Sequence, residues 1–217
     1  MVPLHGYRGD PTPPPLVLRP GGPTVAVSRE AGARGTTVAE LVGKRLGWTV
    51  VTQELLDFLA EDDPADLENE LTDTARLWAV AGWRNLVQAR GLSADAPAAA
   101  VARRLFALAA RGNVVVVGRG AGFVLPAATT LSVRLVAPAA DRANSLSDRL
   151  RLPASAAVAE RDNRDRGRAE FLTALSDVPI DDPTGYDLLL NVARLGADGA
   201  ADVVAAAARR KFPDVPA

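Results

Sequence analysis

The chain has no cysteine and only one histidine among its 217 residues. Without cysteine, the protein can form neither a disulfide nor a thiolate nucleophile nor a cysteine metal site. The single histidine, His5, lies in a segment rich in proline and glycine. The sequence therefore does not favour a histidine-based catalytic triad or zinc site, and any chemistry rests on other side chains.

Long apolar runs and a strong net charge are also missing. No stretch approaches the ~20 apolar residues that a membrane-spanning helix needs. The N-terminus does not start with a basic segment followed by an apolar run, so we expect a cytoplasmic protein. The net charge is -1, so no overall field attracts a nucleic acid polymer, and the arginines can act only locally.

What the sequence does contain is an alternation of short apolar runs and helical patterns. Residues 1–23 are rich in proline and glycine and are predicted to be a disordered extension of a single folded domain, 24–212. Five strands are predicted, at 24–28, 48–51, 113–117, 131–137 and 187–192. Helices are predicted at 37–46, 54–60 and 198–211, and residues 57–112 form a helical insertion without a clear strand. This alternation predicts an α/β protein with a parallel five-stranded sheet covered on both faces.

A run of charged residues stands out at 160–168, with four arginines among nine residues. Its flanks favour a helix, on which Arg161, Asp165 and Arg168 share one face and Arg164 lies beside them. Guanidinium groups are planar, always charged and suited to bidentate contacts, so such a stripe fits a polyphosphate. The alternative is a solvated helix face whose ion pairs are worth only ~0.3–0.5 kcal/mol each.

The first predicted strand leads through a glycine-containing loop into a helix that begins with threonine. Loops of this kind bind phosphate through their N–H groups and the positive helix end. A full P-loop reads G-x-x-x-x-G-K-[ST]. Here Thr37 fits the hydroxyl position, but the lysine is missing, and Gly35 stands where some nucleotide kinases carry it. Thr36 and Thr37 are equally suited to cap the helix, a role that is compatible with Mg²⁺ binding.

Four segments together resemble one family of nucleotide kinases. Residues 160–172, ERDNRDRGRAEFL, closely resemble the lid of bacterial cytidylate kinases. Residues 28–47 look like the start of a cytidylate kinase-like branch, which carries S-R-E-x-G-S-G-G in place of the usual P-loop. Residues 114–125 resemble the strand and turn with the family's substrate arginine, and residues 182–191 resemble the branch's C-terminal strand motif. The resemblance covers about residues 24–210.

The resemblance implies a P-loop NTPase-like three-layer fold with a helical lid at 153–175. It also implies transfer of a phosphoryl group from ATP to CMP or dCMP with Mg²⁺, in a monomer or weak homo-oligomer. Arg161, Asp165 and Arg168 match lid positions that contact the nucleotide and position the lid. Arg164 matches a lid arginine that reaches the transferring phosphoryl group.

The remaining site residues come from the other matched segments. Arg119 matches the arginine that holds the monophosphate, and Gln53 falls near a residue that touches the base. Thr37 matches the hydroxyl that helps to bind Mg²⁺. The resemblance assigns the ATP-binding loop to Gly32, Arg34, Gly35, Thr36 and Thr37.

Two departures from the family pattern bear on activity. Gly35 replaces the P-loop lysine, and Gly120 replaces an aspartate that follows the substrate arginine in true cytidylate kinases. Arg29 or Arg34 is then a candidate to take over part of the lysine's work, although a guanidinium has a different reach from an ammonium group.

Two other functions fit parts of the sequence. The missing lysine favours a nucleotide-binding protein without kinase activity, whereas the lid arginines argue for catalysis. Residues 118–122, GRGAG, follow a predicted strand, and Asp141 lies near the distance of a ribose-binding acid, which suggests a dinucleotide-binding oxidoreductase. However, Phe123 stands where the third glycine of that motif belongs, and the motif follows the third strand rather than the first.

Overall fold

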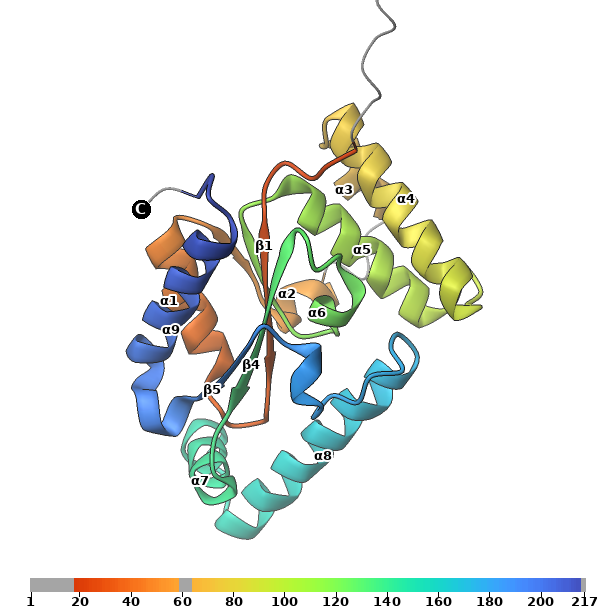
Figure 1. Cartoon of the computed structure of the whole chain (residues 1–217). Coiled ribbons are helices and arrows are strands. Elements are labelled where there is room, and N and C mark those ends of the chain that lie inside the picture. The colour runs from red at the N-terminus through yellow and green to blue at the C-terminus, as the bar shows by residue number, and fades with distance from the viewer. Residues whose placement is uncertain (1–17, 59–63, 216–217) are drawn as a thin grey trace, which may run out of the picture.

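A computed structural model describes residues 18–58 and 64–215 (Figure 1). His5, most of the predicted 1–23 extension and the last two residues of the predicted helix 54–60 lie outside the described residues. Residues 18–23 form neither helix nor strand, in agreement with their proline and glycine content.

The described residues form a five-stranded parallel sheet with the strand order β2-β3-β1-β4-β5. The strands are β1 (Thr24–Arg29), β2 (Thr49–Val51), β3 (Val114–Val117), β4 (Thr130–Val136) and β5 (Leu188–Asn191). All five lie within one residue of their predicted bounds, so the predicted α/β fold is confirmed. β1 is central, and its carboxyl end lies beside those of β3 and β4.

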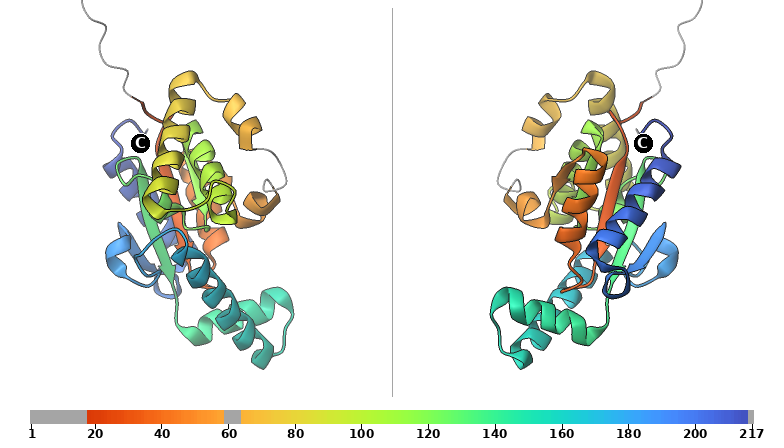
Figure 2. Two further views of the ribbon diagram at one scale, coloured as in Figure 1. Left: turned by 90° about the vertical axis from the view of Figure 1, so that its right-hand side faces the viewer. Right: turned by 90° about the vertical axis from the view of Figure 1, so that its left-hand side faces the viewer.

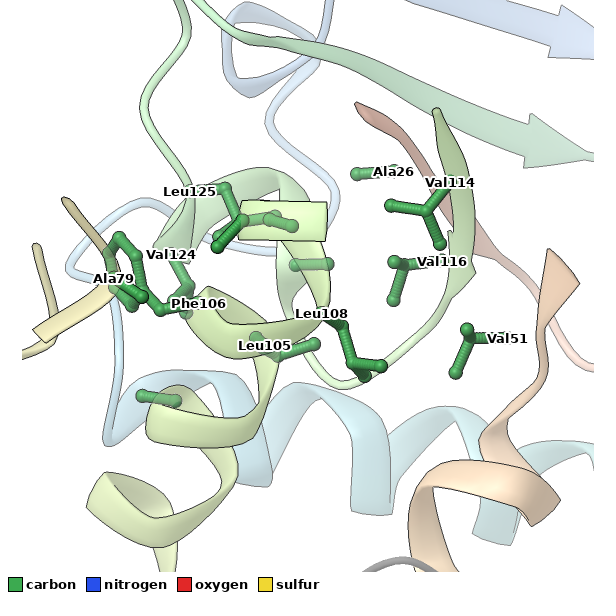
Figure 3. Close-up of a cluster of buried hydrophobic side chains, with 14 of the residues drawn as sticks. Ala26, Val51, Ala79, Leu105, Phe106, Leu108, Val114, Val116, Val124 and Leu125 are labelled. Atoms are coloured by element: carbon green, nitrogen blue, oxygen red, sulfur yellow. The ribbon is translucent and has the colours of Figure 1, made fainter. Parts of the chain in front are cut away.

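The central strands are apolar because both faces of the sheet are covered. Along β3, Val114 and Val116 point to one face and Val115 and Val117 to the other, and all four are buried. On the first face, Val114 and Val116 pack in a cluster with α4 (Asp73–Arg90), α5 (Pro97–Arg111) and α6 (Ala121–Val124), which Figure 3 shows. On the second face, Val115 and Val117 pack in a cluster with α1 (Gly35–Leu46) and α9 (Val192–Lys211).

The helix that closes the chain begins earlier than predicted. It was expected at 198–211, but α9 follows β5 directly from Val192. Gly196 interrupts it with a left-handed backbone, φ 71°, and the predicted helix corresponds to the part after this kink.

The described residues between β2 and β3 form helices joined by turns, without a strand. It contains α2 (Gln53–Phe58), α3 (Pro64–Asn69), α4 and α5. The Trp78 and Phe106 rings pack edge to face with centroids 5.6 Å apart, and the Trp83 indole donates to the Ala99 carbonyl over 2.9 Å. These aromatic side chains belong to the core or pack against it, rather than forming an exposed stacking surface.

Two further helices, α7 (Ala139–Leu150) and α8 (Ala154–Thr173), form a hairpin beyond the carboxyl edge of the sheet (Figures 1 and 2). A short 3₁₀ turn, η1 (Pro183–Gly185), then leads toward β5. In the described segments, none of the helices has the length and apolar character to cross a membrane.

Candidate functional site

The carboxyl ends of β1 and β3 open into a cleft of about 1070 Å³. Ligands of open parallel sheets bind at this edge. Among residues 18–58 and 64–215, six arginines and four carboxylates line the cleft, which favours an anionic ligand. Of the sequence-predicted site residues, the cleft brings together Gly32, Arg34, Gly35, Thr36, Thr37, Gln53, Arg119, Arg164 and Arg168.

The loop between β1 and α1 presents a helix N-terminus to the cleft. Gly32 and Arg34 turn the chain with left-handed backbones, φ 84° and 55°. Arg34 is the N-cap residue of α1, no described side chain caps this end, and no acidic residue lies in its first turn. The alternative role of Thr36 and Thr37 as N-caps is therefore wrong. The first N–H groups of α1 keep their partial positive charge and are available to an anion.

Gly32 is required by the packing of α7 on this loop. A Cβ atom at Gly32 would lie 2.2 Å from the carbonyl oxygen of Arg142, which no side chain tolerates. The α7 backbone therefore lies directly against the loop.

Arg119 enters the cleft from a strained turn after β3. Gly118, Arg119 and Gly120 all have positive φ, of 89°, 53° and 70°. An arginine in this conformation costs about 1–2 kcal/mol relative to an ordinary backbone. Its guanidinium carbon lies 5.3 Å from the ring centroid of Phe171 on α8, a cation–π distance. The turn thus directs a positive charge toward the helical hairpin.

Arg29 is a buried arginine at the end of β1. Its Nη2 donates to Oε1 of Gln53 over 2.8 Å. Burial, and next the nearby charge of Arg168, lower the pKa of Arg29 to about 10. The group is still protonated at neutral pH, so the cleft contains a buried positive charge.

Arg164 and Arg168 face the cleft from α8. Arg164 donates to Oε1 of Glu160 over 2.6 Å, one turn earlier on the helix. Arg168 donates from Nη1 to Asp165 over 3.0 Å, while its Nε is buried without a hydrogen-bond partner among residues 18–58 and 64–215. Burial lowers the pKa of Arg168, and Asp165 partly opposes this shift. A buried N–H of this kind is available to a ligand.

Asp165 ties α8 to α7 and to the loop after β1 instead of lining the cleft. Its Oδ1 accepts from the backbone N–H of Ala31 over 2.7 Å, and its Oδ2 accepts from Nη1 of Arg142 over 2.6 Å. Glu30 joins this group, because its Oε2 accepts from the N–H of Ala137 over 3.0 Å and lies 3.3 Å from Arg142. We call Glu30, Arg142 and Asp165 the hairpin latch.

Arg161 also lies away from the cleft. Its guanidinium donates to Asp162 and to the Ala139 carbonyl, over 2.8 and 2.9 Å, and so links α8 to α7. On α8, the charged stripe therefore divides into Arg164 and Arg168, which face the cleft, and Arg161 and Asp165, which hold the hairpin.

Sequence reasoning missed Arg142, because α7 was not predicted. A signal was present, since Ala143, Leu146 and Leu150 follow a helical spacing. Glu30 had no predicted role, and its partners lie over a hundred residues away in the chain.

The family model described as the cytidylate kinase-like family matches residues 24–194. The chain belongs to the cytidylate kinase-like family. The match spans β1, the cleft, the hairpin and β5, so the resemblance seen in four separate segments is confirmed for the folded chain. The family supports a function like that of nucleoside monophosphate kinases.

Curated relatives and solved structures resemble the chain. A cytidylate kinase of Natronomonas pharaonis is 33% identical over 106 residues, and one of Thermococcus kodakarensis is 36% identical over 108 residues. Each match covers 48% of this chain and 54% of the relative, so the chain spans about half the length of both. The crystal structure of an uncharacterized protein from Eubacterium ventriosum superposes with a TM-score of 0.61. It is 17% identical, with 86% of this chain and 98% of that chain covered, and shows the shared fold.

The described residues of the cleft provide few side chains that could coordinate a metal ion without further ligands. Within the described residues, no three acidic or histidine side chains gather into a metal-binding group. Mg²⁺ commonly needs only one or two protein oxygens when phosphates and water supply the rest. The exposed Thr37 hydroxyl at the start of α1 fits that arrangement.

Proposed function

We propose that the chain transfers the γ-phosphoryl group of ATP to a nucleoside monophosphate, with CMP or dCMP as the leading acceptor. The observation that carries this proposal is the convergence of Arg119, Arg164 and Arg168 with the uncapped α1 terminus on one cleft. Phosphoryl transfer requires mainly positioning and stabilisation of charge, and this cleft offers both.

In this proposal, donor and acceptor lie on different sides of the cleft. The loop of Gly32, Arg34, Gly35 and Thr36, with the α1 terminus, holds the donor phosphates. Thr37 contributes a hydroxyl to Mg²⁺, which screens the phosphate charge when it is bound. Arg119 holds the acceptor phosphate.

Gln53 is proposed to face the acceptor base. In the structure its amide oxygen accepts from Arg29, which leaves the amide NH₂ group as a donor. A donor suits the ring nitrogen and carbonyl oxygen of cytosine.

The α7–α8 hairpin, with residues 153–175, is proposed to act as the lid. Arg164 and Arg168 point from it into the cleft, so that closure brings both guanidinium groups to the transferring phosphoryl group and excludes water. Asp165 and Arg161 set the position of the lid through their contacts with the loop and α7. An arginine at this transition state is worth on the order of 10³–10⁵ in rate.

The alternative of a catalytically weak or silent nucleotide binder is supported by one observation, the glycine at position 35. The dinucleotide-binding alternative has less support. The turn at 118–122 leads into α6, which has four residues. So short a helix provides little dipole for a pyrophosphate.

The deciding experiment measures ADP formation from Mg-ATP against a panel of nucleoside monophosphates. Arg164→Met and Arg168→Met are combined in one variant, and Arg166→Met serves as the matched control because Arg166 is exposed on the same helix. We expect turnover that depends on a cytidine monophosphate, falls at least 10³-fold in the double variant and is retained in the control. Binding of ATP or CMP without turnover would instead identify the silent binder.

A further inference from the structure

We propose that Arg29, which runs from the start of α1 to the turn that carries Arg119, supplies the buried positive charge for the phosphates in the cleft that a lysine at position 35 would otherwise supply. This inference deepens the proposed function and rests on it for the identity of the anion. It assigns a phosphate-binding role to a strand residue outside the helix that carries the P-loop lysine position.

The first argument is the space beside Gly35. A Cβ atom at Gly35 would lie 2.7 Å from Cγ, 2.9 Å from Cβ and 3.2 Å from Cδ of Arg29. The stem of Arg29 therefore fills the volume that any side chain at position 35 would enter. A lysine at 35 and Arg29 in its present place exclude each other.

The second argument is the course of the guanidinium group. A Cβ atom at Gly118 would lie 2.2 Å from Nη1 of Arg29, so this part of the side chain runs beside the turn that carries Arg119. Arg29, Gly35, Gly118 and Arg119 all line the same cleft. Two glycines, one at the start of α1 and one after β3, thus leave room for the arginine between them.

The third argument is the missing countercharge. Arg142, Arg164 and Arg168 each pair with a carboxylate. In the part of the chain that the structure describes, Arg29 has no ion pair, and its hydrogen-bond partner is the neutral Gln53. A buried charge without a countercharge is costly, and an anionic ligand would remove this cost.

The surrounding charges strengthen this argument. Arg168, Arg119 and Arg149 each disfavour the protonated form of Arg29, and Glu54 opposes them. The protein therefore concentrates positive charge around a group that stays charged at neutral pH. Arg34 is the other candidate to replace the lysine. It is exposed at the start of α1, so water solvates its charge and an anion is not needed to stabilise it.

The test uses inorganic tripolyphosphate and Mg-ATP as probes in calorimetric titrations of the full chain. Arg29→Met keeps the stem and removes the charge, with Arg166→Met as control. We expect Arg29→Met to weaken tripolyphosphate binding by about 10- to 100-fold, as expected for loss of charged hydrogen bonds. We also expect its ligand-free Tm to equal or exceed that of the wild type, which shows that the variant is folded.

A charge swap tests the shared space. Gly35→Lys alone is expected to lower Tm, whereas Arg29→Ala combined with Gly35→Lys is expected to bind tripolyphosphate at least about 10-fold more tightly than Arg29→Ala alone. Wild-type affinity in Arg29→Met, or an unchanged Tm in Gly35→Lys, would overturn the inference.

The two proposals fail in different ways. If the wild type binds tripolyphosphate through Arg29 but forms no ADP with any acceptor, the proposed kinase activity fails and the role of Arg29 stands. If the wild type forms ADP and Arg29→Met does so with unchanged KM for ATP, the role of Arg29 fails alone.

Discussion

In the described part of the chain, three arginines adopt a left-handed backbone, and two of them line the cleft. Arg34, Arg119 and Arg151 have φ angles of 55°, 53° and 53°. Such a conformation costs a non-glycine residue about 1–2 kcal/mol. Arg151 simply ends α7, where a left-handed residue is common. At Arg34 and Arg119, the same strained backbone conformation places an arginine at the proposed phosphate site.

Comparison of Arg151 and Arg34 separates backbone strain from binding. We expect Arg151→Gly and Arg34→Gly each to stabilise the fold by about 1 kcal/mol, because glycine adopts positive φ without steric cost. For a chain of this size the expected rise in Tm is about 2–4 °C, measured by thermal unfolding. Nucleotide affinity should fall in Arg34→Gly and remain unchanged in Arg151→Gly. A loss of affinity in both variants would contradict the assignment of Arg34 to the ATP-binding loop.

At the scale of elements, the hairpin latch joins α7, α8 and the loop after β1. Asp165 accepts three hydrogen bonds there, from Ala31, Arg142 and Arg168. We expect Asp165→Asn to weaken these contacts by about 1–3 kcal/mol, because a neutral amide cannot replace both carboxylate oxygens. Hydrogen exchange in residues 139–173 should become faster, and KM for ATP should rise.

Asp162→Asn provides the control for the latch. Asp162 lies on the same helix and pairs with Arg161, but its side chain is 52% exposed. Its exchange rates and KM should stay near those of the wild type. Equal effects of the two substitutions would show that Asp165 has no special role in holding the hairpin.

The elements were predictable to different degrees. The strands are short apolar runs, and β1, β3 and β4 are buried on both faces, so local pattern alone located all five. Helix α8 was indicated by its charged stripe, but the division of that stripe depends on where α7 and the loop lie. Asp165 reaches Ala31 across 134 residues of sequence, and no local pattern carries that information. Periodicity could place Arg161 and Asp165 on one face but not identify what that face contacts.

At the scale of the whole molecule, the chain is nearly neutral while its cleft is not. The net charge is -1, yet the described lining of the cleft contains six arginines and four carboxylates. We therefore expect inorganic tripolyphosphate at about 100 times its Kd to stabilise the protein by ~2.7 kcal/mol. The corresponding rise in Tm is about 5–10 °C. Cytidine, which lacks phosphate, should produce a much smaller shift under matched conditions in the same thermal scan. A shift from cytidine as large as that from tripolyphosphate would show that the base, not the phosphates, supplies most of the binding energy.

The packing of the Arg29 stem against Gly35 also limits how the proposed phosphate site can change by mutation. A lysine gained at position 35 meets the arginine stem, and an arginine lost from position 29 leaves the cleft without its buried cation. If Arg29 has the proposed role, we expect each single substitution to weaken phosphate binding or folding, although the two together exchange one cation for another. We therefore expect a conversion between the two arrangements to require both substitutions together.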